Sequence, residues 1–351
     1  MISLAQGNLL HASAEALVNT VNTEGVMGKG IALQFKQAYP EMFKAYQKEA
    51  KSGHLSLGSM HVWESGMLEG PRYVINFPTK GHWRSRSKLS DVRAGLIDLV
   101  RVIRELNIKS IAVPPLGCGN GGLDWRDVEP IIRQALEGLT DVEVLLYPPA
   151  GAPEPKAMPR AGASPRMTSG RAALVGVIQK YMDQSLNAPS LIEAQKLMYF
   201  LQVDGEPLRL KFEANRYGPY ADNLRHVLAQ VEGYFLTGFG DGSARVLEGV
   251  PLRPLEEGIS KAKSSLADHP DTVERMHDVL RLVDGFESAY GLELLATVHW
   301  LASQKPAEDD AEIARRVADW SPRKSRMFTA EHVQLALNTL REENWLTKSL
   351  A

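Results

Sequence analysis

Four short loops in the first 150 residues carry the residues whose types and spacing could do chemistry. Each follows an apolar run and is rich in glycine, asparagine or proline: Gly7–Leu10, Val18–Asn22 with Gly25–Ala32, Pro78–Gly81, and Pro114–Gly122. Glycines just before a helix let backbone N–H groups approach an anion, and the helix N-terminus adds a favourable dipole. Two of the loops could therefore hold the two phosphates of a pyrophosphate. The alternative is a set of tight turns with no ligand.

Known phosphate signatures fit these loops poorly. Lys29 is followed by glycine rather than by Ser or Thr, so the loop is not a P-loop. Gly117, Gly119 and Gly122 have the spacing G-x-G-x-x-G, but only one strand-like run follows them, too little for a dinucleotide-binding fold. The nine histidines show no metal-ligand spacing, and we expect no metal. Cys118, the single cysteine, is expected to fill space in its loop rather than act as a nucleophile.

The elements that must position these loops alternate between strand and helix patterns. Short apolar runs rich in β-branched or aromatic residues predict strands at Ile2–Gln6, Ala16–Val21, Ser59–Trp63, Tyr73–Phe77, Ser110–Val113 and Val142–Tyr147. Helical patterns lie between them at Ile31–Tyr39, Glu41–Ser52, Asp91–Leu106 and Asp124–Leu139, the last capped by Asp124. This alternation predicts an α/β domain with a mostly parallel or mixed sheet covered by helices. Ligands in such folds bind beyond the carboxyl ends of the strands.

A change of composition divides the chain. Residues 151–170 are dominated by Pro, Gly, Ala and Ser, which predicts a flexible linker between residues 1–150 and residues 171–351. The last part has helical patterns at Arg171–Asp183, Leu191–Val203, Ala221–Gln230, Asp271–Gly285, Leu292–Ser303, Ala307–Ala318 and Glu331–Asn344. Strand-like pieces lie at Leu208–Glu213 and Arg245–Val250, and Arg216–Tyr220 predicts a tight turn into the next helix. We expect a mainly α-helical second domain.

Charge is distributed unevenly between these parts. The whole chain has a net charge of −2, but residues 1–150 carry +1, residues 151–170 carry +2 and residues 171–351 carry −5. No run approaches the roughly 18 apolar residues of a membrane span. The N-terminus lacks the pattern of a signal peptide, and a single cysteine cannot form an internal disulfide. These features predict a cytoplasmic protein without a membrane partner.

Together the loops resemble those of the macrodomain family, an ADP-ribose-binding fold with a mixed sheet sandwiched between helices. The resemblance rests on Gly7-Asn8, the VNTVN segment at 18–22, Gly28–Ala32 and the PLGCGNGG loop, and it covers about residues 1–150. MGKGIALQF and INFPTKGHWR are similar to the branch of the family that contains a lysine-dependent glycohydrolase. With the helical domain, the chain resembles antitoxins that remove ADP-ribose from thymine in single-stranded DNA.

The resemblance implies a role for each matching residue. Asn8, with Leu9, would contact the adenine, although an aspartate is commoner at this position in the family. Asn22 would hydrogen-bond the distal ribose. The other ADP-ribose contacts would come from Thr20, Val21, Gly28, Lys29, Gly30, Ile31, Ala32, Thr79, Gly117, Cys118, Gly119, Asn120 and Gly121. No cofactor is implied.

Lys80 would be the catalytic residue of this branch. On residue type alone, a surface lysine would be the favoured interpretation. Its amine must be uncharged to attack, whereas a free lysine has a pKa of about 10.4. Burial against Phe77 or Trp83, or the charges of Arg84 and Arg86, could lower the pKa, and a bound diphosphate would raise it. The loop after Gly117 lacks the carboxylate that some relatives pair with the lysine, although Asp124 lies close in the sequence.

A basic segment follows Lys80. Trp83, Arg84 and Arg86 combine an aromatic ring with permanent positive charges, a composition typical of single-stranded DNA contacts. The alternative is a solvated loop.

The helical domain is expected to bind a cognate ADP-ribosyltransferase toxin. The patterns K-L-x-Y-F at 196–200 and F-x-A-x-R-Y-G-P at 212–219 resemble small antitoxin-type helical domains. Its negative charge could occupy the positive DNA groove of such a toxin, with Glu308–Glu312 as one candidate contact. The alternatives are a structural or dimerisation role for this domain. For the first domain they are a non-catalytic ADP-ribose reader or a protein-directed ADP-ribosyl hydrolase.

Overall fold

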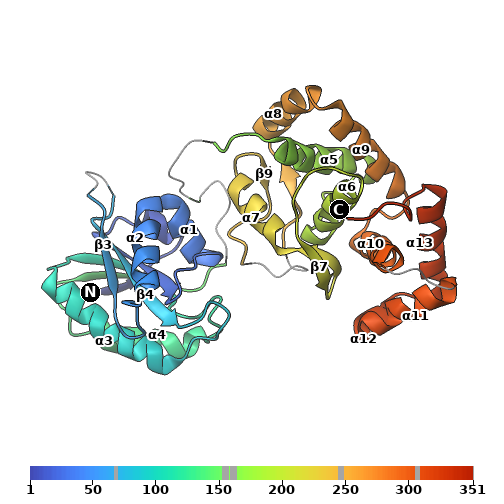
Figure 1. Cartoon of the computed structure of the whole chain (residues 1–351). Coiled ribbons are helices and arrows are strands. Elements are labelled where there is room, and N and C mark those ends of the chain that lie inside the picture. The colour runs from blue at the N-terminus through green and yellow to red at the C-terminus, as the bar shows by residue number, and fades with distance from the viewer. Residues whose placement is uncertain (67–69, 152–157, 159–163, 244–248, 305–308, 351) are drawn as a thin grey trace. The chain divides into compact units, whose positions relative to one another are not determined.

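The computed structural model describes residues 1–66, 70–151, 158, 164–243, 249–304 and 309–350. Its contacts divide the chain into two compact units (Figure 1). The first unit comprises Met1–Ala163 with Gly240–Ser243, and the second comprises Ser164–Phe239 with Ala244–Ala351. Most of the expected linker, at 152–157 and 159–163, lies outside the described residues.

A six-stranded sheet forms the centre of the first unit, in the order β1-β6-β5-β2-β4-β3. The strands are β1 (Ile2–Leu4), β2 (Ala16–Asn22), β3 (His61–Glu64), β4 (Tyr73–Lys80), β5 (Ser110–Val113) and β6 (Glu143–Leu146). β3 is antiparallel to β4, and the other neighbouring pairs are parallel. The helices are the 3₁₀ turn η1 (Leu9–His11), α1 (Gly30–Ala38), α2 (Pro40–Lys51), α3 (Leu89–Glu105) and α4 (Trp125–Leu136).

Helices cover both faces of this sheet because successive strand side chains point to opposite sides. Val18 and Ile75 belong to a core built with α3 and α4. Their neighbours Leu17 and Val74 belong to a second core built with α1 and α2. Figure 1 shows the two helix pairs on opposite sides of the sheet. The predicted mixed sheet between helices is confirmed.

β4 is longer than its sequence predicts. A proline removes a ladder donor, so the sequence predicts that the strand ends before Pro78. In the structure β4 continues through Pro78 to Lys80, so the prediction of a loop at Pro78–Lys80 is wrong. The pairing with β3 ends at Asn76, and beyond it β4 pairs with β2 alone. Pro78 therefore lies where β4 is an edge strand, and the missing donor costs little.

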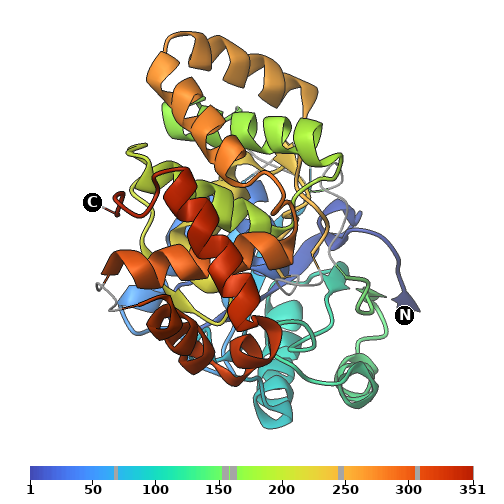
Figure 2. The same cartoon turned by 90° about the vertical axis from the view of Figure 1, so that its right-hand side faces the viewer.

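The second unit is mainly helical, as predicted. Its helices are α5 (Ser169–Ser185), α6 (Leu191–Val203), α7 (Asp222–Val231), α8 (Glu256–Ala267), α9 (Pro270–Leu282), α10 (Ala289–Gln304), α11 (Asp310–Trp320), α12 (Pro322–Met327) and α13 (Ala330–Glu342). α6 and α10 are buried on nearly all sides, and α10 packs against both α6 and α13 (Figure 2). α8 and α12 were not expected from the sequence.

Two small antiparallel sheets complete the second unit. β7 (Phe212–Asn215) pairs with β8 (Gly218–Ala221), and β9 (Leu236–Thr237) pairs with β10 (Arg253–Pro254). The predicted turn into a helix at 216–220 is therefore wrong in part, because only Arg216 and Tyr217 form the turn and the chain then enters β8. The strand expected at Arg245–Val250 lies mostly outside the described residues. Within the described ranges, no helix is long and apolar enough to cross a membrane.

Candidate active site

The carboxyl ends of β2 and β4 bring two of the expected site residues together. Asn22 and Lys80, the last residues of these strands, are paired in register, just after an irregularity between Val21 and Asn22. Thr79 lies beside them, buried, and its hydroxyl donates to Val21 O at 3.4 Å. Parallel pairing thus places Lys80 at the edge of the sheet where ligands of α/β folds bind.

The Asn22 side chain shapes the loop that follows β2. Its Oδ1 accepts from the backbone N–H groups of Glu24 at 3.0 Å and Val26 at 3.3 Å, and its Nδ2 donates to Val26 O at 2.6 Å. The Tyr46 hydroxyl donates to Asn22 O at 2.5 Å. Asn22 is 5% exposed, and its amide organises the turn before Gly28. Its expected contact with a distal ribose stays a prediction.

The two glycine loops touch one another. Gly30 has φ +60° as the first residue of α1, and a Cβ there would lie 2.9 Å from Asn120 Nδ2. A side chain at this position would be strained by the backbone and would push the second loop away. The Gly28–Ala32 and Gly117–Gly121 segments therefore approach each other closely at Gly30 and Asn120, and their expected binding of a diphosphate stays a prediction.

The second loop folds tightly onto its own backbone. Leu123 N–H donates to Gly117 O at 3.1 Å, Gly122 N–H donates to Gly119 O at 3.1 Å, and Ser87 N–H donates to Gly121 O at 3.0 Å. Ser87 is 5% exposed, and its Oγ has no hydrogen-bond partner among the described residues. Ser87 was not expected to be near this loop, because its hydroxyl and the loop are separated by 30 or more residues in the sequence.

The Lys80 amine lies against the second loop. Its Nζ donates to the carbonyl oxygen of Asn120 at 3.1 Å. Burial lowers the pKa of Lys80, and the positive charge of Lys29 lowers it further. The sequence left the direction of this pKa shift open. In the structure burial is the main cause of the lowering, and the cation that contributes is Lys29 rather than Arg84 or Arg86. Both causes favour the neutral amine that a nucleophilic lysine requires.

Cys118 and Asp124 have structural environments. Burial, with a smaller effect from Asp124, raises the pKa of the Cys118 thiol to about 11, which disfavours the thiolate. The Asp124 carboxylate accepts from the Arg126 backbone N–H at 2.9 Å, the expected helix cap, and pairs with Arg126 Nη2 at 2.8 Å. Both carboxylate oxygens are thus engaged at the start of α4.

The expected adenine contacts lie in the loop after β1. The Asn8 side chain caps η1 by accepting from Leu10 N–H at 3.0 Å. Leu9 is 4% exposed and packs in the core that α1 and α2 share. Thr20, at the carboxyl half of β2, is half-buried.

The basic segment after β4 forms a stack of three side chains. The rings of His82 and Trp83 are 5.4 Å apart between centroids and inclined by 24°, and the Arg84 guanidinium lies 4.4 Å from the Trp83 ring. Trp83 is 40% exposed, and His82 Nε2 lies 3.6 Å from a carboxylate oxygen of Glu24. Arg86 is also exposed. The sequence indicated Trp83, Arg84 and Arg86, but not the ordering by His82 and Glu24.

The chain is similar to a known domain family and, along nearly its whole length, to a named protein. The family model described as the Macro domain matches residues 18–132. A Mycobacterium tuberculosis protein named DNA ADP-ribosyl glycohydrolase is 47% identical, covering 97% of this chain and 99% of that protein. The chain belongs to the DNA ADP-ribosyl glycohydrolase family.

Two further relatives extend the comparison. A solved macrodomain of Mycobacterium tuberculosis DarG is 62% identical, covers 43% of this chain and 99% of that structure, and aligns with a TM-score of 0.43. A Thermosipho africanus protein named DNA ADP-ribosyl transferase-DNA ADP-ribosyl glycohydrolase fusion protein is 33% identical over 42% of this chain and 42% of its own length.

Membership of the DNA ADP-ribosyl glycohydrolase family tests the expected fold and the expected enzyme class. The macrodomain fold and the hydrolase class are confirmed, and a purely non-catalytic reader is set aside. Among the described residues, no group of three or more His, Cys, Asp or Glu side chains could hold a metal ion.

Proposed function

We propose that this protein removes ADP-ribose from thymine bases of single-stranded DNA and also binds the DarT-type ADP-ribosyltransferase that attaches it. The observation that carries the first part is the Lys80 amine, part-buried, close to the charge of Lys29, and held 3.1 Å from Asn120 O at the junction of two glycine loops. The name and near-complete coverage of the Mycobacterium tuberculosis relative support the same reaction.

ADP-ribose would lie across the carboxyl edge of the sheet. Backbone N–H groups of the Gly28–Ala32 and Gly117–Gly121 segments, at the start of α1 and before α4, would bind the diphosphate. Two of them already have partners, since Gly30 N–H donates to Asp241 O at 2.9 Å and Cys118 N–H donates to Pro115 O at 3.1 Å. Asn8 and Leu9 would contact the adenine, and Asn22 the distal ribose. Thr20, Val21 and Thr79 would line the floor of the site. Since Lys80 is the register partner of Asn22, the anomeric carbon of that ribose would lie within reach of its amine.

The reaction would proceed in two steps. The neutral amine of Lys80 attacks the anomeric carbon, and the bond between this carbon and the thymine nitrogen breaks. The electron pair of that bond goes to the nitrogen, which takes up the proton that the amine loses as its new bond forms, and thymine is restored. Water then attacks the same carbon of the lysyl adduct, releasing ADP-ribose and returning the amine. Because Asp124 is paired with Arg126, Lys80 would act without a carboxylate from this loop.

The stack of His82, Trp83 and Arg84 would hold the DNA beside the modified base. An exposed aromatic face accepts a base by stacking, at about 1–3 kcal/mol per base, while Arg84 and Arg86 attract phosphates. The stack begins two residues after Lys80, so a base neighbouring the modified thymine could reach it.

The second unit would bind the transferase toxin. It has its own hydrophobic core, and the Thermosipho africanus relative carries both activities in one polypeptide according to its name. The acidic stretch at Glu308–Glu312 was suggested as a toxin contact, but its described carboxylates already have partners within the unit. Asp309 caps α11, Asp310 pairs with Arg341, and Glu312 pairs with Arg316. Glu308 lies outside the described residues. Charge mimicry by this stretch therefore finds little support in the structure.

A comparison of substrates tests the proposed reaction. The wild-type chain is incubated with a single-stranded oligonucleotide ADP-ribosylated on thymine and, separately, with an ADP-ribosylated protein. We expect rapid loss of the modification from DNA and slow or no loss from protein. Faster release from protein would favour the protein-directed hydrolase instead.

A double variant tests the DNA contact. Arg84→Ala with Arg86→Ala should weaken DNA binding most at low salt. If the variant and the wild type bound DNA with equal affinity at every salt concentration, this would argue against the contact.

A further inference from the structure

A tyrosine at the tip of the β7–β8 hairpin has two arginines close to its ring. The guanidinium carbon of Arg323 is 5.2 Å from the centroid of the Tyr217 ring, and that of Arg216 is 5.7 Å away. Arg326 follows Arg323 by three residues on α12, so their side chains are neighbours on that helix. Arg216 and Arg326 are exposed, and no described carboxylate pairs with either. Arg216, Tyr217, Arg323 and Arg326 are called the turn–α12 surface below.

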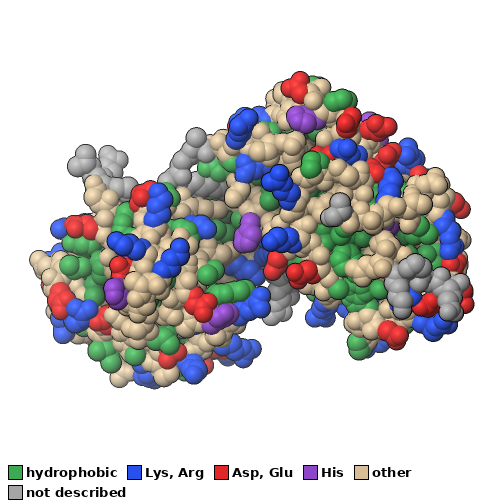
Figure 3. Space-filling model, in the orientation of Figure 1, with side chains coloured by type: hydrophobic (Ala, Val, Ile, Leu, Met, Phe, Trp, Pro, Cys, Tyr) green, Lys and Arg blue, Asp and Glu red, His purple; other side chains and the backbone are tan. Residues whose placement is uncertain are grey.

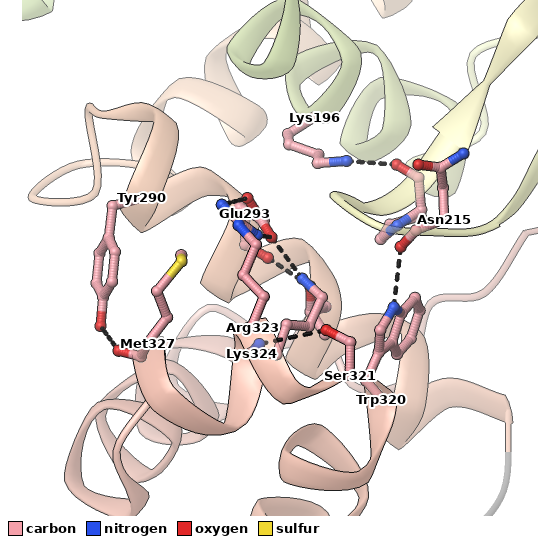
Figure 4. Close-up of polar contacts among 11 residues, drawn as sticks. Lys196, Asn215, Tyr290, Glu293, Trp320, Ser321, Arg323, Lys324 and Met327 are labelled. Atoms are coloured by element: carbon pink, nitrogen blue, oxygen red, sulfur yellow. Dashed lines mark hydrogen bonds and ion pairs between the residues drawn. The ribbon is translucent and has the colours of Figure 1, made fainter. Parts of the chain in front are cut away.

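The hairpin that carries this surface is held by side chains directed at its backbone. Lys196 Nζ donates to Pro219 O at 2.5 Å, and Trp320 Nε1 donates to Asn215 O at 2.9 Å (Figure 4). Gln195 exchanges two hydrogen bonds with the backbone of Ala221, at 3.0 and 2.9 Å. Both strands are thus tied to helices of the unit, which fixes the conformation of the turn.

A buried ionic cluster lies beneath the turn. Glu293 is 1% exposed and accepts from Arg323 Nη1 at 2.6 Å, Arg323 Nη2 at 3.1 Å and Lys324 Nζ at 2.6 Å. Arg323 and the fully buried Lys324 thus share one carboxylate, and the fully buried Lys196 is near enough for the charge of Glu293 to act on it. Buried ion clusters contribute little net stability and can instead specify one geometry. Gly218, with φ +81°, fits closely here, since a Cβ would lie 2.7 Å from Thr297 Oγ1.

The cluster leaves an excess of positive charge under and around an ordered tyrosine. Tyrosine and arginine are the residues enriched at the energetic centres of protein interfaces, and a fixed conformation lowers the entropic cost of binding. The attractive partner is therefore a group of negative charges with an apolar face for the ring to contact.

Charge elsewhere on the unit decides which class of anion fits. Residues 171–351 carry −5 overall, and basic and acidic side chains are interspersed on the face shown in Figure 3. A long polyanion such as single-stranded DNA would meet repulsion beyond the turn–α12 surface. A protein partner could place a short acidic segment on the positive turn–α12 surface and basic residues against the net negative remainder of the unit. Such a partner would be attracted at both places.

We propose that the turn–α12 surface is the docking site for an acidic segment of the ADP-ribosyltransferase toxin. This inference rests on the proposed function, in which the second unit binds that toxin. The carboxylates of the segment would pair with Arg216 and Arg326, and its chain would pack on Tyr217. Arg323, held by Glu293, would keep the tyrosine ring in place rather than serve as a mobile contact.

Charge reversal tests the docking site on the full chain. Affinity for the purified toxin is measured by calorimetry for the wild type and for Arg216→Glu with Arg326→Glu. The matched control reverses two exposed cations of the same unit, Arg253→Glu with Lys263→Glu, which lie on β10 and α8. We expect the first pair to weaken binding at least about tenfold and the control pair to change it much less.

Each outcome has a distinct meaning. Equal losses for both pairs, or none for either, would overturn the docking site while leaving toxin binding intact. A wild-type chain that does not bind the toxin would overturn the toxin-binding proposal itself. Loss of oligonucleotide binding without loss of toxin binding would identify the surface as a DNA contact and contradict the inference. Thermal unfolding and hydrolysis of modified DNA, measured on the same samples, show that each variant is folded.

Discussion

Asn22 and Lys80 are paired in register at the ends of the parallel strands β2 and β4, yet their side chains reach different loops. Asn22 binds the backbone of Glu24 and Val26, in the turn before Gly28. Lys80 donates to Asn120 O in the other glycine loop. One strand pair thus fixes both halves of the proposed diphosphate site relative to the amine that would attack the ribose.

The pH dependence of hydrolysis should change when Lys29 is neutralised. Its charge lowers the pKa of Lys80, in addition to burial, so Lys29→Gln should raise that pKa. Since attack requires the neutral amine, the rising limb of the pH–rate profile should move to higher pH, with a slower reaction at neutral pH. Single-turnover rates measured across a range of pH give the position of this limb. Lys36→Gln, which removes another lysine charge farther along α1, is the control. An unshifted limb would show that Lys29 does not act on Lys80.

Contact between the glycine loops predicts an asymmetry between two nearby glycines. Gly30→Ala forces a left-handed residue and places a Cβ 2.9 Å from Asn120 Nδ2, so it should destabilise the unliganded protein by about 1–2 kcal/mol. Gly28→Ala meets nothing closer than 3.9 Å and should cost much less. Thermal unfolding of both variants provides the comparison. Equal losses would contradict both the left-handed conformation of Gly30 and its close approach to Asn120.

The Cys118 thiol should be slow to react. Its pKa, raised to about 11 by burial and by Asp124, leaves little thiolate at neutral pH. Because the chain has one cysteine, alkylation followed by mass spectrometry reports on this site alone. The rate should stay far below that of free cysteine at pH 7, rise about tenfold per pH unit, and level off only near pH 11. Rapid labelling at pH 7 would instead indicate an activated thiol.

Glu293 should be essential to the second unit. Glu293→Gln leaves Arg323 and Lys324 without their buried counter-charge, which should destabilise the unit by about 3–5 kcal/mol. Burial has already lowered the pKa of Lys196 to about 7, and loss of the carboxylate would lower it further. Urea unfolding measures the effect. Glu274→Gln, on the exposed side of α9, is the control, and similar midpoints for the two variants would refute the role of the cluster.

Much of the first unit could be predicted because its signals are local. Short apolar runs with β-branched residues marked the six strands to within a few residues, and Asp124 caps α4 as expected. The glycine loops were visible because glycine marks close backbone approach wherever it occurs. Pro78 misled the prediction, because the sequence does not show that β3 stops pairing at Asn76 and leaves β4 free on that side.

Long-range charges could not be predicted. Lys29 is the N-cap residue of α1 and Lys80 ends β4, whereas Arg84 and Arg86 are nearer to Lys80 in the sequence. Lys196, Glu293 and Lys324 meet in one buried cluster although about a hundred and about thirty residues separate them in the chain. Such contacts depend on how helices pack, which a local pattern does not specify. The β7–β8 hairpin was missed in part because Gly218 and Pro219 are typical of turns.

The central claim is that Lys80 is the nucleophile for removal of ADP-ribose from DNA. The most direct measurement follows loss of ADP-ribose from a thymine-modified single-stranded oligonucleotide with wild type, Lys80→Ala and Lys80→Arg, alongside ADP-ribose affinity. We predict that wild type clears the modification, that both variants lose at least about a hundredfold in rate, and that ADP-ribose binding survives in Lys80→Arg. Hydrolysis by Lys80→Ala at the wild-type rate would contradict the account.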